Sequence, residues 1–578
     1  MSRSATMMCV LVAPALLPGQ AIVFDSTPGP TGDAVIMGTE GRGRLLMSAD
    51  DGVHGLEMFA VDAFGTPLLI EFLPGPASSF PALIGRGKDI VFFVADGQLQ
   101  SRLWRMNPAT SVVTIVSPTV DSPGELVPVS NGFVFRGHDT VHGDELWRTD
   151  GTTPGTYMLF DLLLGGLSAY PSRFVGNGSI ALFNSGQFSN EPWRTDGVTA
   201  QLLLDINPTG GSNPSGFLPV GSRWFFTAFT PATGRELWTS DGTTTGTQLL
   251  EIGPGSATGA GNPVRCGTRA MLIGDDGVHG AEPWISDGTT AGATMIADIA
   301  PGSGSSTAPF VPSMFTVGDG AFFLANDGIH GFEPWFTDGT AAGTHLIADI
   351  NPGSANSCLY PFLSPQPVFA LAIGEDRTVA FVADDGVHGN EIWITDGTPT
   401  GTFMLPETLS GPASAEPRDF TRVGPNVFFT ADDGVLGREL WSFPTSLTRA
   451  AVIETMSPPC TGSQPYPRIK TQSVPRVGNP VFAIGVEQAP PNALAVLLLA
   501  FDRFDQQSGG CTVFPHSPGV AFGTITSAAG GANVTVPIPA LPFLAGAQLY
   551  AQWGAVQFGG PIAGVVTVSD ALFVQVGK

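Results

Sequence analysis

The chain has 578 residues, and 43% of them are hydrophobic, enough to bury a large core. Glycine (75) and proline (50) exceed a fifth of the chain, whereas lysine and arginine total only 25, which favours short strands and tight turns over long helices. The formal net charge of −25 opposes binding to phosphate backbones and to anionic lipids, so nucleic-acid partners are not expected. Such an acidic surface suits solubility outside a cell and attracts divalent cations.

The N-terminus predicts export. An arginine precedes an apolar run over residues 5–17, and residues 19–21 offer a small-residue cleavage site. We expect residues 1–21 to be a signal peptide, followed by a strand over residues 21–24. The later apolar run over residues 493–501 is too short to cross a bilayer, so membrane insertion is not expected.

A repeated motif is the strongest signal in the sequence. Glu145-Leu146-Trp147-Arg148-Thr149-Asp150-Gly151-Thr152 recurs nearly unchanged from Glu236 and from Glu391, and three further copies have proline in place of the leucine. Degenerate copies begin at residues 57, 102 and 439. The aromatic residues of successive copies lie 43 to 58 residues apart. These aromatic residues are Phe59, Trp104, Trp147, Trp193, Trp238, Trp284, Trp335, Trp393 and Trp441.

Each repeat contains the same elements in the same order. An apolar strand, as at residues 321–323, leads into an acidic glycine turn and then into the tryptophan strand. An Asp-Gly-Thr turn follows, then a strand such as residues 295–299, and a Pro-Gly-Ser connection leads to one more strand. Four short strands in about 46 residues match one blade of a β-propeller.

The alternation of a strand places Glu145 and Trp147 on one face and Leu146 on the other. A large aromatic side chain once per repeat suits the face-to-face packing of adjacent blades. The proline variants, Pro192, Pro283 and Pro334, cannot donate to a strand ladder. We therefore expect this position at a strand start or at the outer edge of a sheet.

The acidic turns are candidate calcium sites, because carboxylate and carbonyl oxygens are the ligands that calcium prefers. The favoured alternative is that each aspartate accepts backbone N–H bonds while glycine supplies a positive φ. Histidines recur in these turns at positions 54, 142, 279, 330 and 388, and we expect each to bridge its turn to a neighbouring strand. The candidate metal ligands are Asp50, Asp51, Asp275, Asp276, Asp384, Asp385, Asp432 and Asp433, together with the related pair Asn326 and Asp327.

No catalytic residue is predicted. A further set of repeated aspartates precedes glycine, a pair typical of tight hairpin turns: Asp150, Asp196, Asp241, Asp287, Asp338 and Asp396. The sequence contains no nucleophile elbow, phosphate loop or zinc-protease motif. Residues repeated around a ring also differ from a catalytic constellation, in which unrepeated groups converge on one cleft.

The motif resembles the ELWxxDGT repeat of secreted, mostly bacterial proteins, over roughly residues 30–455. The resemblance implies a propeller-like fold and export, and it implies no established activity. We therefore predict an all-β chain with a propeller of eight or nine four-stranded blades over residues 22–456.

A second domain, a C-terminal β-sandwich, is predicted over residues 457–578 because the repeats stop and alternating strands begin. Residues 533–536, 548–553 and 571–576 read as its strands. Residues 477–480, 489–493 and 550–553 resemble a small C-terminal domain of exported proteins from environmental bacteria. Cys460 and Cys511 are a candidate disulfide, whereas the sequence leaves the pairing of Cys266 and Cys358 open.

Three functions fit these features. The first is an exported, non-enzymatic binding or surface-interaction protein that recognises a glycan or a protein with one propeller face. The second is a secreted polysaccharide hydrolase or lyase acting across the central channel. The third is a calcium-stabilised structural scaffold. We expect the protein to be secreted, or located at the cell surface or in the periplasm, in a bacterium. The sequence leaves the oligomeric state open.

Overall fold

The computed structural model is all-β, and its described part contains no α-helix. It describes residues 21–24, 32–33, 35–39, 43–51, 53–62, 66–72, 77–86, 90–96, 101–108, 110–186, 190–253, 255, 259–289, 293–307, 314–358, 370–374, 377–435, 437–448, 452–456, 467–476, 479–500, 503–508, 511–515, 520–538, 547–560 and 564–576. The predicted signal peptide, apart from Ala21, and Cys460 of the predicted disulfide lie outside these residues. Among the described residues, no helix has both the length and the apolar character needed to cross a membrane.

Most repeats form separate four-stranded antiparallel sheets in chain order. Within the described residues these sheets are β3 (Val35–Thr39), β4 (Arg44–Asp50), β5 (Leu56–Asp62) and β6 (Pro67–Ile70); β15 (Ser172–Gly176), β16 (Ala181–Ser185), β17 (Glu191–Thr195) and β18 (Ala200–Leu202); β19 (Ser215–Val220), β20 (Arg223–Thr230), β21 (Gly234–Ser240) and β22 (Gln248–Leu250); β23 (Val264–Cys266), β24 (Arg269–Asp275), β25 (Ala281–Ser286) and β26 (Thr294–Met295); β27 (Met314–Val317), β28 (Gly320–Asn326), β29 (Phe332–Thr337) and β30 (His345–Leu346); and β31 (Ala370–Ala372), β32 (Val379–Asp384), β33 (Asn390–Thr395) and β34 (Phe403–Met404).

Two repeats share a larger sheet, and the last repeat is completed from the N-terminus. The larger sheet contains β7 (Ala82–Arg86), β8 (Val91–Asp96), β9 (Ser101–Asn107), β10 (Val112–Asp121), β11 (Val127–Val129), β12 (Gly132–Asp139), β13 (Gly143–Thr149) and β14 (Tyr157–Phe160). The last repeat contains β35 (Arg418–Val423), β36 (Asn426–Asp432) and β37 (Gly437–Pro444), joined by β1 (Ala21–Phe24) and β2 (Gly32–Asp33). Two short 3-10 helices, η2 (Pro399–Gly401) and η3 (Thr445–Thr448), lie among these strands.

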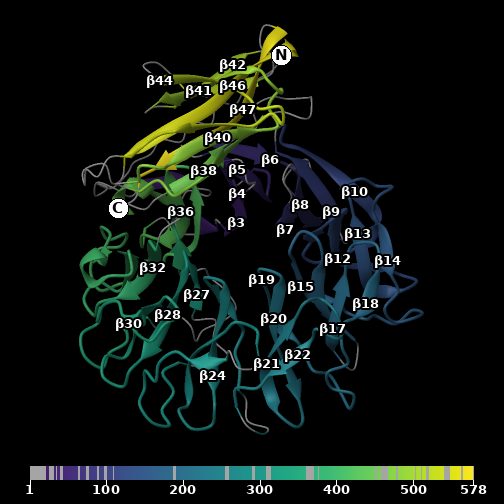
Figure 1. Ribbon diagram of the computed structural model, residues 1–578, viewed down its shortest axis with the longest axis vertical. Coiled ribbons are helices and arrows are strands. Elements are labelled where there is room, and N and C mark those ends of the chain that lie inside the picture. The colour runs from purple at the N-terminus through teal and green to yellow at the C-terminus, as the bar shows by residue number, and fades with distance from the viewer. Residues whose placement is uncertain are drawn as a thin grey trace.

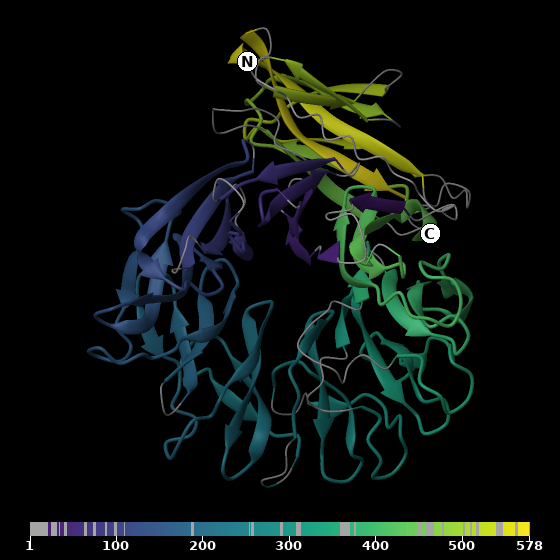
Figure 2. The same ribbon diagram turned by 180° about the vertical axis from the view of Figure 1, so that it is seen from behind.

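The repeat sheets follow one another around a ring, as Figures 1 and 2 show from its two sides, and the first strands β3, β7, β15, β19 and β27 lie towards its middle (Figure 1). One core cluster closes this ring, because it joins Phe59 of β5, Ile394 of β33 and Phe428 of β36. The second strand of each repeat is a continuous apolar run with both faces covered, as in β28, where Gly320–Ala325 are all buried. This arrangement fits a β-propeller.

The C-terminal strands form a separate group across one side of the ring (Figure 1). A five-stranded sheet contains β38 (Val452–Met456), β47 (Gly564–Gln575), β46 (Gln548–Gly560), β41 (Leu494–Ala500) and β44 (Val520–Ile525); smaller sheets contain β39 (Arg468–Thr471), β40 (Ala483–Glu487) and β45 (Ala532–Thr535), and β42 (Arg503–Ser508) and β43 (Cys511–Pro515). Phe482, Ile484 and Trp553 share the core between the two larger sheets. The predicted boundary at residue 456 therefore falls at the end of a strand, β38, that pairs with β47.

Two predictions about strands were wrong. The strand expected over residues 295–299 is only Thr294–Met295, because Ile299 turns its N–H to the carboxylate of Glu282 instead of to a neighbouring strand. Pro283 lies within β25, the third strand of four, and not at a sheet edge. It is tolerated there because β26 pairs only from Trp284 onward, and the Pro283 carbonyl still accepts the Ile296 N–H at 2.8 Å.

Candidate functional site

In most repeats, the glutamate two residues before the tryptophan (or Phe59) is buried and binds backbone N–H groups. Glu333 on β29 is fully inaccessible to solvent. Its carboxylate accepts the N–H groups of Ile350 at 3.0 Å and Ser357 at 3.1 Å, and the Ser357 hydroxyl at 2.6 Å. Because residues 350–357 form the connection to the next sheet, this carboxylate fixes that connection. Equivalent bonds are made by Glu57, Glu145, Glu191, Glu236, Glu282 and Glu391.

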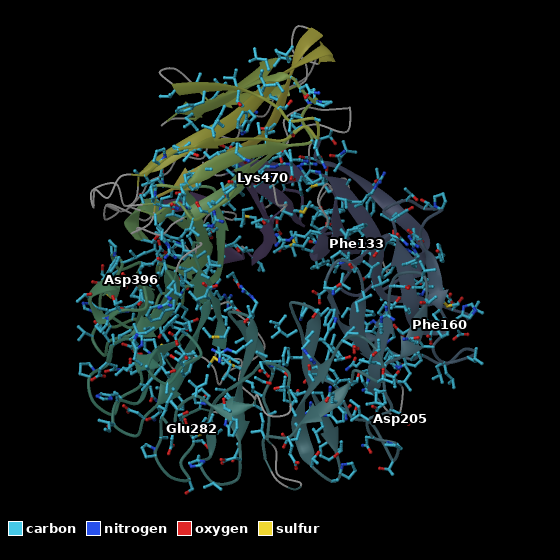
Figure 3. The ribbon with its side chains drawn as sticks, viewed as in Figure 1. Phe133, Phe160, Asp205, Glu282, Asp396 and Lys470 are labelled. Atoms are coloured by element: carbon cyan, nitrogen blue, oxygen red, sulfur yellow. The ribbon has the colours of Figure 1, made fainter. Side chains whose placement is uncertain are left out.

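Burial raises the pKa of Glu333 to about 7, although its hydrogen bonds act in the opposite direction. Burial likewise raises the pKa of Glu145, Glu236 and Glu391 to about 7. These groups lie on strands of four different sheets, β13, β21, β29 and β33, and Figure 3 labels the equivalent Glu282 on β25. They therefore link successive repeats and do not form one acidic cluster.

The acidic turns are closed by hydrogen bonds within each turn. Asp327 accepts the N–H groups of Ile329 and His330, both at 2.9 Å, and its other oxygen lies 2.7 Å from His330 Nδ1. The same i to i+3 pairing joins each of the other repeated histidines to its turn aspartate. The expectation that these histidines bridge to a neighbouring strand was therefore wrong, because the tight turn brings the aspartate of the same turn within reach.

Glycine is required where this turn ends. Gly331 has a φ of +72°, and a Cβ atom there would collide with the carbonyl oxygen of Ala355. The candidate metal ligands lie in turns of separate sheets, and Asp275 and Asp276 both accept N–H groups of their own turn. Within the described part of the chain, no group of three or more His, Cys, Asp or Glu side chains is arranged to hold a metal ion. Calcium binding stays a prediction.

The paired aspartates and histidines have shifted pKa values. Burial alone would raise the pKa of Asp327, but the hydrogen bonds from His330 and Ile329 lower it below 3.8. The hydrogen bond to Asp327 raises the pKa of His330 above 6.5. The pair is therefore an internal brace of the turn, with its charges matched at mildly acidic pH.

These shifts predict a stability maximum at mildly acidic pH. A buried glutamate with a folded pKa of about 7 keeps a proton that the unfolded chain has released above 4.5, so stability falls as pH rises between those values. The histidines contribute stability that is complete below 6.5 and is lost as pH rises through their raised folded pKa. We expect the melting temperature to be lower by roughly 5 °C or more at about pH 8 than at about pH 5.5. Calorimetry across this range tests it, and a level or rising profile would contradict it.

The Asp-Gly-Thr turns are also self-contained. Asp338 accepts the N–H of Thr340 at 2.9 Å and its hydroxyl at 2.6 Å, and the Thr340 hydroxyl in turn accepts the N–H of Gly343 at 3.0 Å. These bonds lower the pKa of Asp338 below 3.8. Arginines of the preceding sheet reach such turns, as Arg148 does when it donates to the carbonyl of Gly197 at 3.1 Å. Asp396, labelled in Figure 3, lies in an equivalent turn elsewhere on the ring.

The repeated tryptophans pack between sheets. Trp147 shares a core cluster with Phe92 and Leu103 of the preceding repeat. Leu146, on the opposite face, packs with Phe183 of the following repeat. Trp193, Trp238, Trp284, Trp335, Trp393 and Trp441 occupy the equivalent strand positions. The unpaired cysteines, Cys266 and Cys358, are both buried free thiols.

One position combines backbone strain with exposure in five repeats, and it was not predicted from the sequence. It is the residue before the proline that leads into the first strand of a sheet. Its φ is positive and close to 50° in several repeats, its side chain is exposed, and the proline after it is buried. Non-glycine residues adopt such a φ at a cost of roughly 1–2 kcal/mol. We call Phe80, Ser122, Tyr170, Asn213 and Glu416, with φ of 44°, 46°, 50°, 46° and 48°, the pre-proline ring.

The pre-proline ring presents a different side chain from each of five repeats on an equivalent backbone. Phe80 is 62% exposed and Tyr170 is 48% exposed. The backbone N–H of Tyr170 donates to the carbonyl of Asp144 at 3.3 Å, and that of Asn213 donates to the carbonyl of Asn190 at 2.9 Å. The sequence feature that reveals the ring is a proline that recurs before the first strand of a repeat, preceded by a residue that varies.

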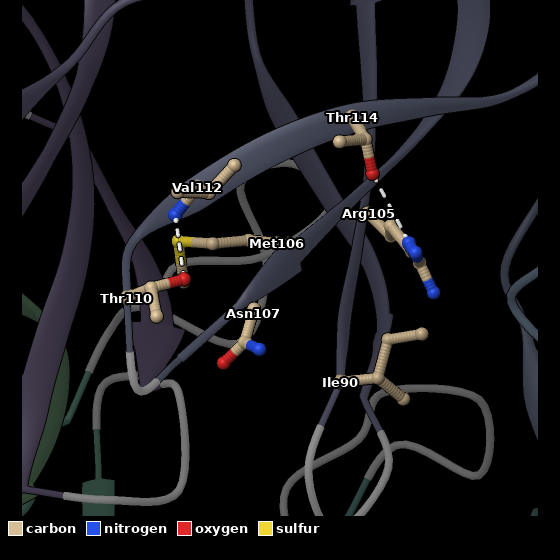
Figure 4. Close-up of a pocket in the computed structure, with 7 residues that line it drawn as sticks. All are labelled: Ile90, Arg105, Met106, Asn107, Thr110, Val112 and Thr114. Atoms are coloured by element: carbon tan, nitrogen blue, oxygen red, sulfur yellow. Dashed lines mark hydrogen bonds between the residues drawn. The ribbon is translucent and has the colours of Figure 1, made fainter. Parts of the chain in front are cut away.

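A surface hollow of about 310 Å³ lies beside the β9–β10 hairpin (Figure 4). Arg105 Nε donates to Thr114 Oγ1 at 3.0 Å across the two strands. Among the described residues that line the hollow, Arg105 carries the one formal charge, and its guanidinium suits a small polar or anionic molecule. The remaining lining residues are Ile90, Met106, Asn107, Thr110 and Val112.

Fold and site together define an all-β repeat protein built from four-stranded antiparallel sheets. No protein-family model matches the chain, and no curated protein matches it. Among solved structures, it is similar to a puromycin-hydrolysing peptidase of Mycobacterium tuberculosis, with 13% identity and a TM-score of 0.32 over 61% of this chain and 57% of that chain. An oligogalacturonate lyase in complex with manganese has 12% identity and a TM-score of 0.32, over 74% of this chain and 97% of that chain. This chain thus spans less than two thirds of the peptidase's length.

Proposed function

We propose that this chain is a secreted, non-enzymatic binding protein of the ELWxxDGT-repeat type, which recognises a glycan or a protein with one face of a propeller. Each repeat is one blade of a nine-bladed propeller, and β1 completes the last blade. The C-terminal strands form a β-sandwich. The pairing of β1 with β37 and the core cluster shared by the first and last repeats support this blade count.

The pre-proline ring is the observation that carries the binding function. A constant backbone that displays Phe, Ser, Tyr, Asn and Glu in turn is suited to recognition, because specificity resides in side chains that a rigid scaffold positions. The strain is maintained although glycine would relieve it, which favours a role for the side chains. By contrast, the repeated carboxylates and histidines already hold turns and connections together.

A double substitution tests the binding function. Phe80 and Tyr170 are each replaced by serine, which Ser122 shows to be compatible with the same backbone. We expect the parent chain to bind members of an array of immobilised polysaccharides and extracellular proteins, and F80S/Y170S to lose roughly tenfold or more of that affinity. Phe403→Ser removes an exposed aromatic side chain from the outer strand β34 and should leave binding unchanged.

Two results would count against the binding function. The first is affinity that F80S/Y170S retains in full. The second is release of shortened sugars from any polysaccharide on the array, which would favour the hydrolase or lyase alternative. Melting the chain with and without a chelator tests the calcium alternative separately. Calcium bound to the folded turns would raise the melting temperature, so the chelator should lower it if calcium is bound.

A further inference from the structure

The connection between β14 and β15 differs in composition from its counterparts. Residues 161–169 read Asp-Leu-Leu-Leu-Gly-Gly-Leu-Ser-Ala, whereas residues 349–357 read Asp-Ile-Asn-Pro-Gly-Ser-Ala-Asn-Ser. The backbones correspond, because Gly165 has a φ of +98° and Gly353 a φ of +93°. Leu164 thus replaces a proline, and Leu167 replaces an alanine.

The hydrogen bonds of the two connections also correspond. Ser168 accepts the N–H of Asp144 at 2.9 Å, and Asn356 accepts the N–H of Phe332 at 2.8 Å. Both connections are also fixed by their buried glutamates, through the N–H groups of Leu162 and Ile350. The leucines are therefore displayed on a backbone that is the same without them, and neither is needed to build it.

These leucines form an exposed apolar patch with the tip of the adjacent turn. Leu164 is 84% exposed, Leu167 is 53% exposed, and Val141 is 65% exposed. The loops are adjacent, since a Cβ at Gly166 would lie 3.5 Å from the Val141 carbonyl oxygen and Asp144 binds Ser168. Valine or isoleucine tips recur in other turns, but the connections that follow the turns of Val278 and Ile329 read Pro-Gly-Ser at the corresponding positions. We call Val141, Leu164 and Leu167 the leucine patch.

Acidic groups surround the leucine patch. Asp139 holds the turn of Val141 by accepting its N–H at 2.8 Å. Asp144 contacts Ser168 at 3.2 Å, and Asp161 begins the same connection as the leucines. Among the described residues, Arg136 lies 3.7 Å and His138 lies 3.3 Å from Asp144, and His142 pairs with Asp139 at 3.0 Å. The patch is thus apolar at its centre and rimmed by carboxylates, two of which are paired with basic side chains, on a chain of net charge −25.

We propose that the leucine patch docks an extended segment of a partner protein in which aliphatic side chains alternate with lysine or arginine. This inference rests on the proposed binding function and assigns it a second contact point. Exposed aliphatic groups favour burial against similar groups, and the acidic rim selects a basic partner. A second copy of this chain is a poor occupant, because three side chains fall well short of the roughly 800 Å² per partner of a stable interface and both surfaces are negative.

The substitutions that test the docking site are taken from the chain's own repeats. Leu164→Pro and Leu167→Ala install the residues found at Pro352 and Ala355, so the connection should keep its structure and the melting temperature should be unchanged. Fluorescence anisotropy of the full chain measures binding of labelled (Leu-Lys)6, (Ser-Lys)6 and (Leu-Glu)6 peptides in physiological salt. We expect (Leu-Lys)6 to bind about tenfold or more tightly than the other two. In L164P/L167A this advantage should disappear.

Ile329→Ser is the matched control, because it removes an equally exposed aliphatic tip next to a Pro-Gly-Ser connection. Its affinity for (Leu-Lys)6 should equal that of the parent chain, and hydrogen exchange should show protection by the peptide over residues 139–170. Unchanged (Leu-Lys)6 affinity in L164P/L167A, or protection confined to other repeats, would overturn the proposal. So would a dimer in sedimentation that L164P/L167A dissolves, since the occupant would then be a second copy. If F80S/Y170S loses array binding but L164P/L167A keeps its affinity for (Leu-Lys)6, the docking site is refuted and the proposed binding function stands.

Discussion

Replacing Glu333 by alanine should destabilise the protein by about 3–5 kcal/mol, one of the two largest effects expected from a local change. The carboxylate is fully buried and accepts the N–H groups of Ile350 and Ser357 as well as the Ser357 hydroxyl. Alanine would leave these buried donors without acceptors and open a cavity between two repeats. Chemical denaturation at about pH 6, followed by tryptophan fluorescence, measures the loss.

Two companion variants separate this role from a general sensitivity to glutamate loss. Glu333→Gln keeps one carbonyl oxygen, so it should lose less stability than alanine, and its stability should depend less on pH between 4.5 and about 7. Glu251→Ala removes an exposed glutamate and should change stability by less than about 0.5 kcal/mol. If E333A were as stable as E251A, the buried carboxylate would not be holding the connection.

The repeat architecture could be predicted because it depends on local patterns. The spacing of the tryptophans, the alternation around Leu146 and the acidic glycine turns each specify strands and hairpins through short-range chemistry. The strands predicted in the C-terminal region, at residues 533–536, 548–553 and 571–576, are confirmed within one residue of their predicted ends or as parts of longer strands. The same local chemistry explains why the turn aspartates bind their own backbone.

Other features depend on contacts that the repeat pattern does not contain. The alternation placed Glu145 beside Trp147 but gave no sign that its carboxylate serves the connection 17 residues later. In the repeat of Met295 the equivalent Glu282 accepts the Ile299 N–H in place of a strand ladder, which is why the strand expected there is short. The pre-proline ring could not be predicted from the repeat pattern, because its side chains differ between repeats. The partner of the N-terminal strand was equally hidden, since it lies at the far end of the repeats.

A chain that begins at residue 34 should melt at least about 10 °C below one that begins at residue 21. The shorter chain lacks β1 and β2. Both strands pair with β37, with Ile22 opposite Trp441 and Gly32 opposite Gly437. Without them the last sheet loses its fourth strand, and the buried strand β37 becomes an exposed edge. Calorimetry of the two chains under the same conditions measures the effect.

The size of this effect follows from ring closure. The last sheet shares one core cluster with the first, so a weakened last sheet loosens this cluster, which contains Phe428 and Phe59 and joins the two ends of the ring. A local defect at any other outer strand would leave this closure intact. Shortening β34 by replacing Phe403 and Met404 with glycine is therefore the matched control, and it should lower the melting temperature much less. A synthetic peptide of residues 21–33 added to the shorter chain should restore part of the loss, because strand pairing needs no covalent link. Equal melting temperatures for the two chains would show that the ring closes without its N-terminal strand.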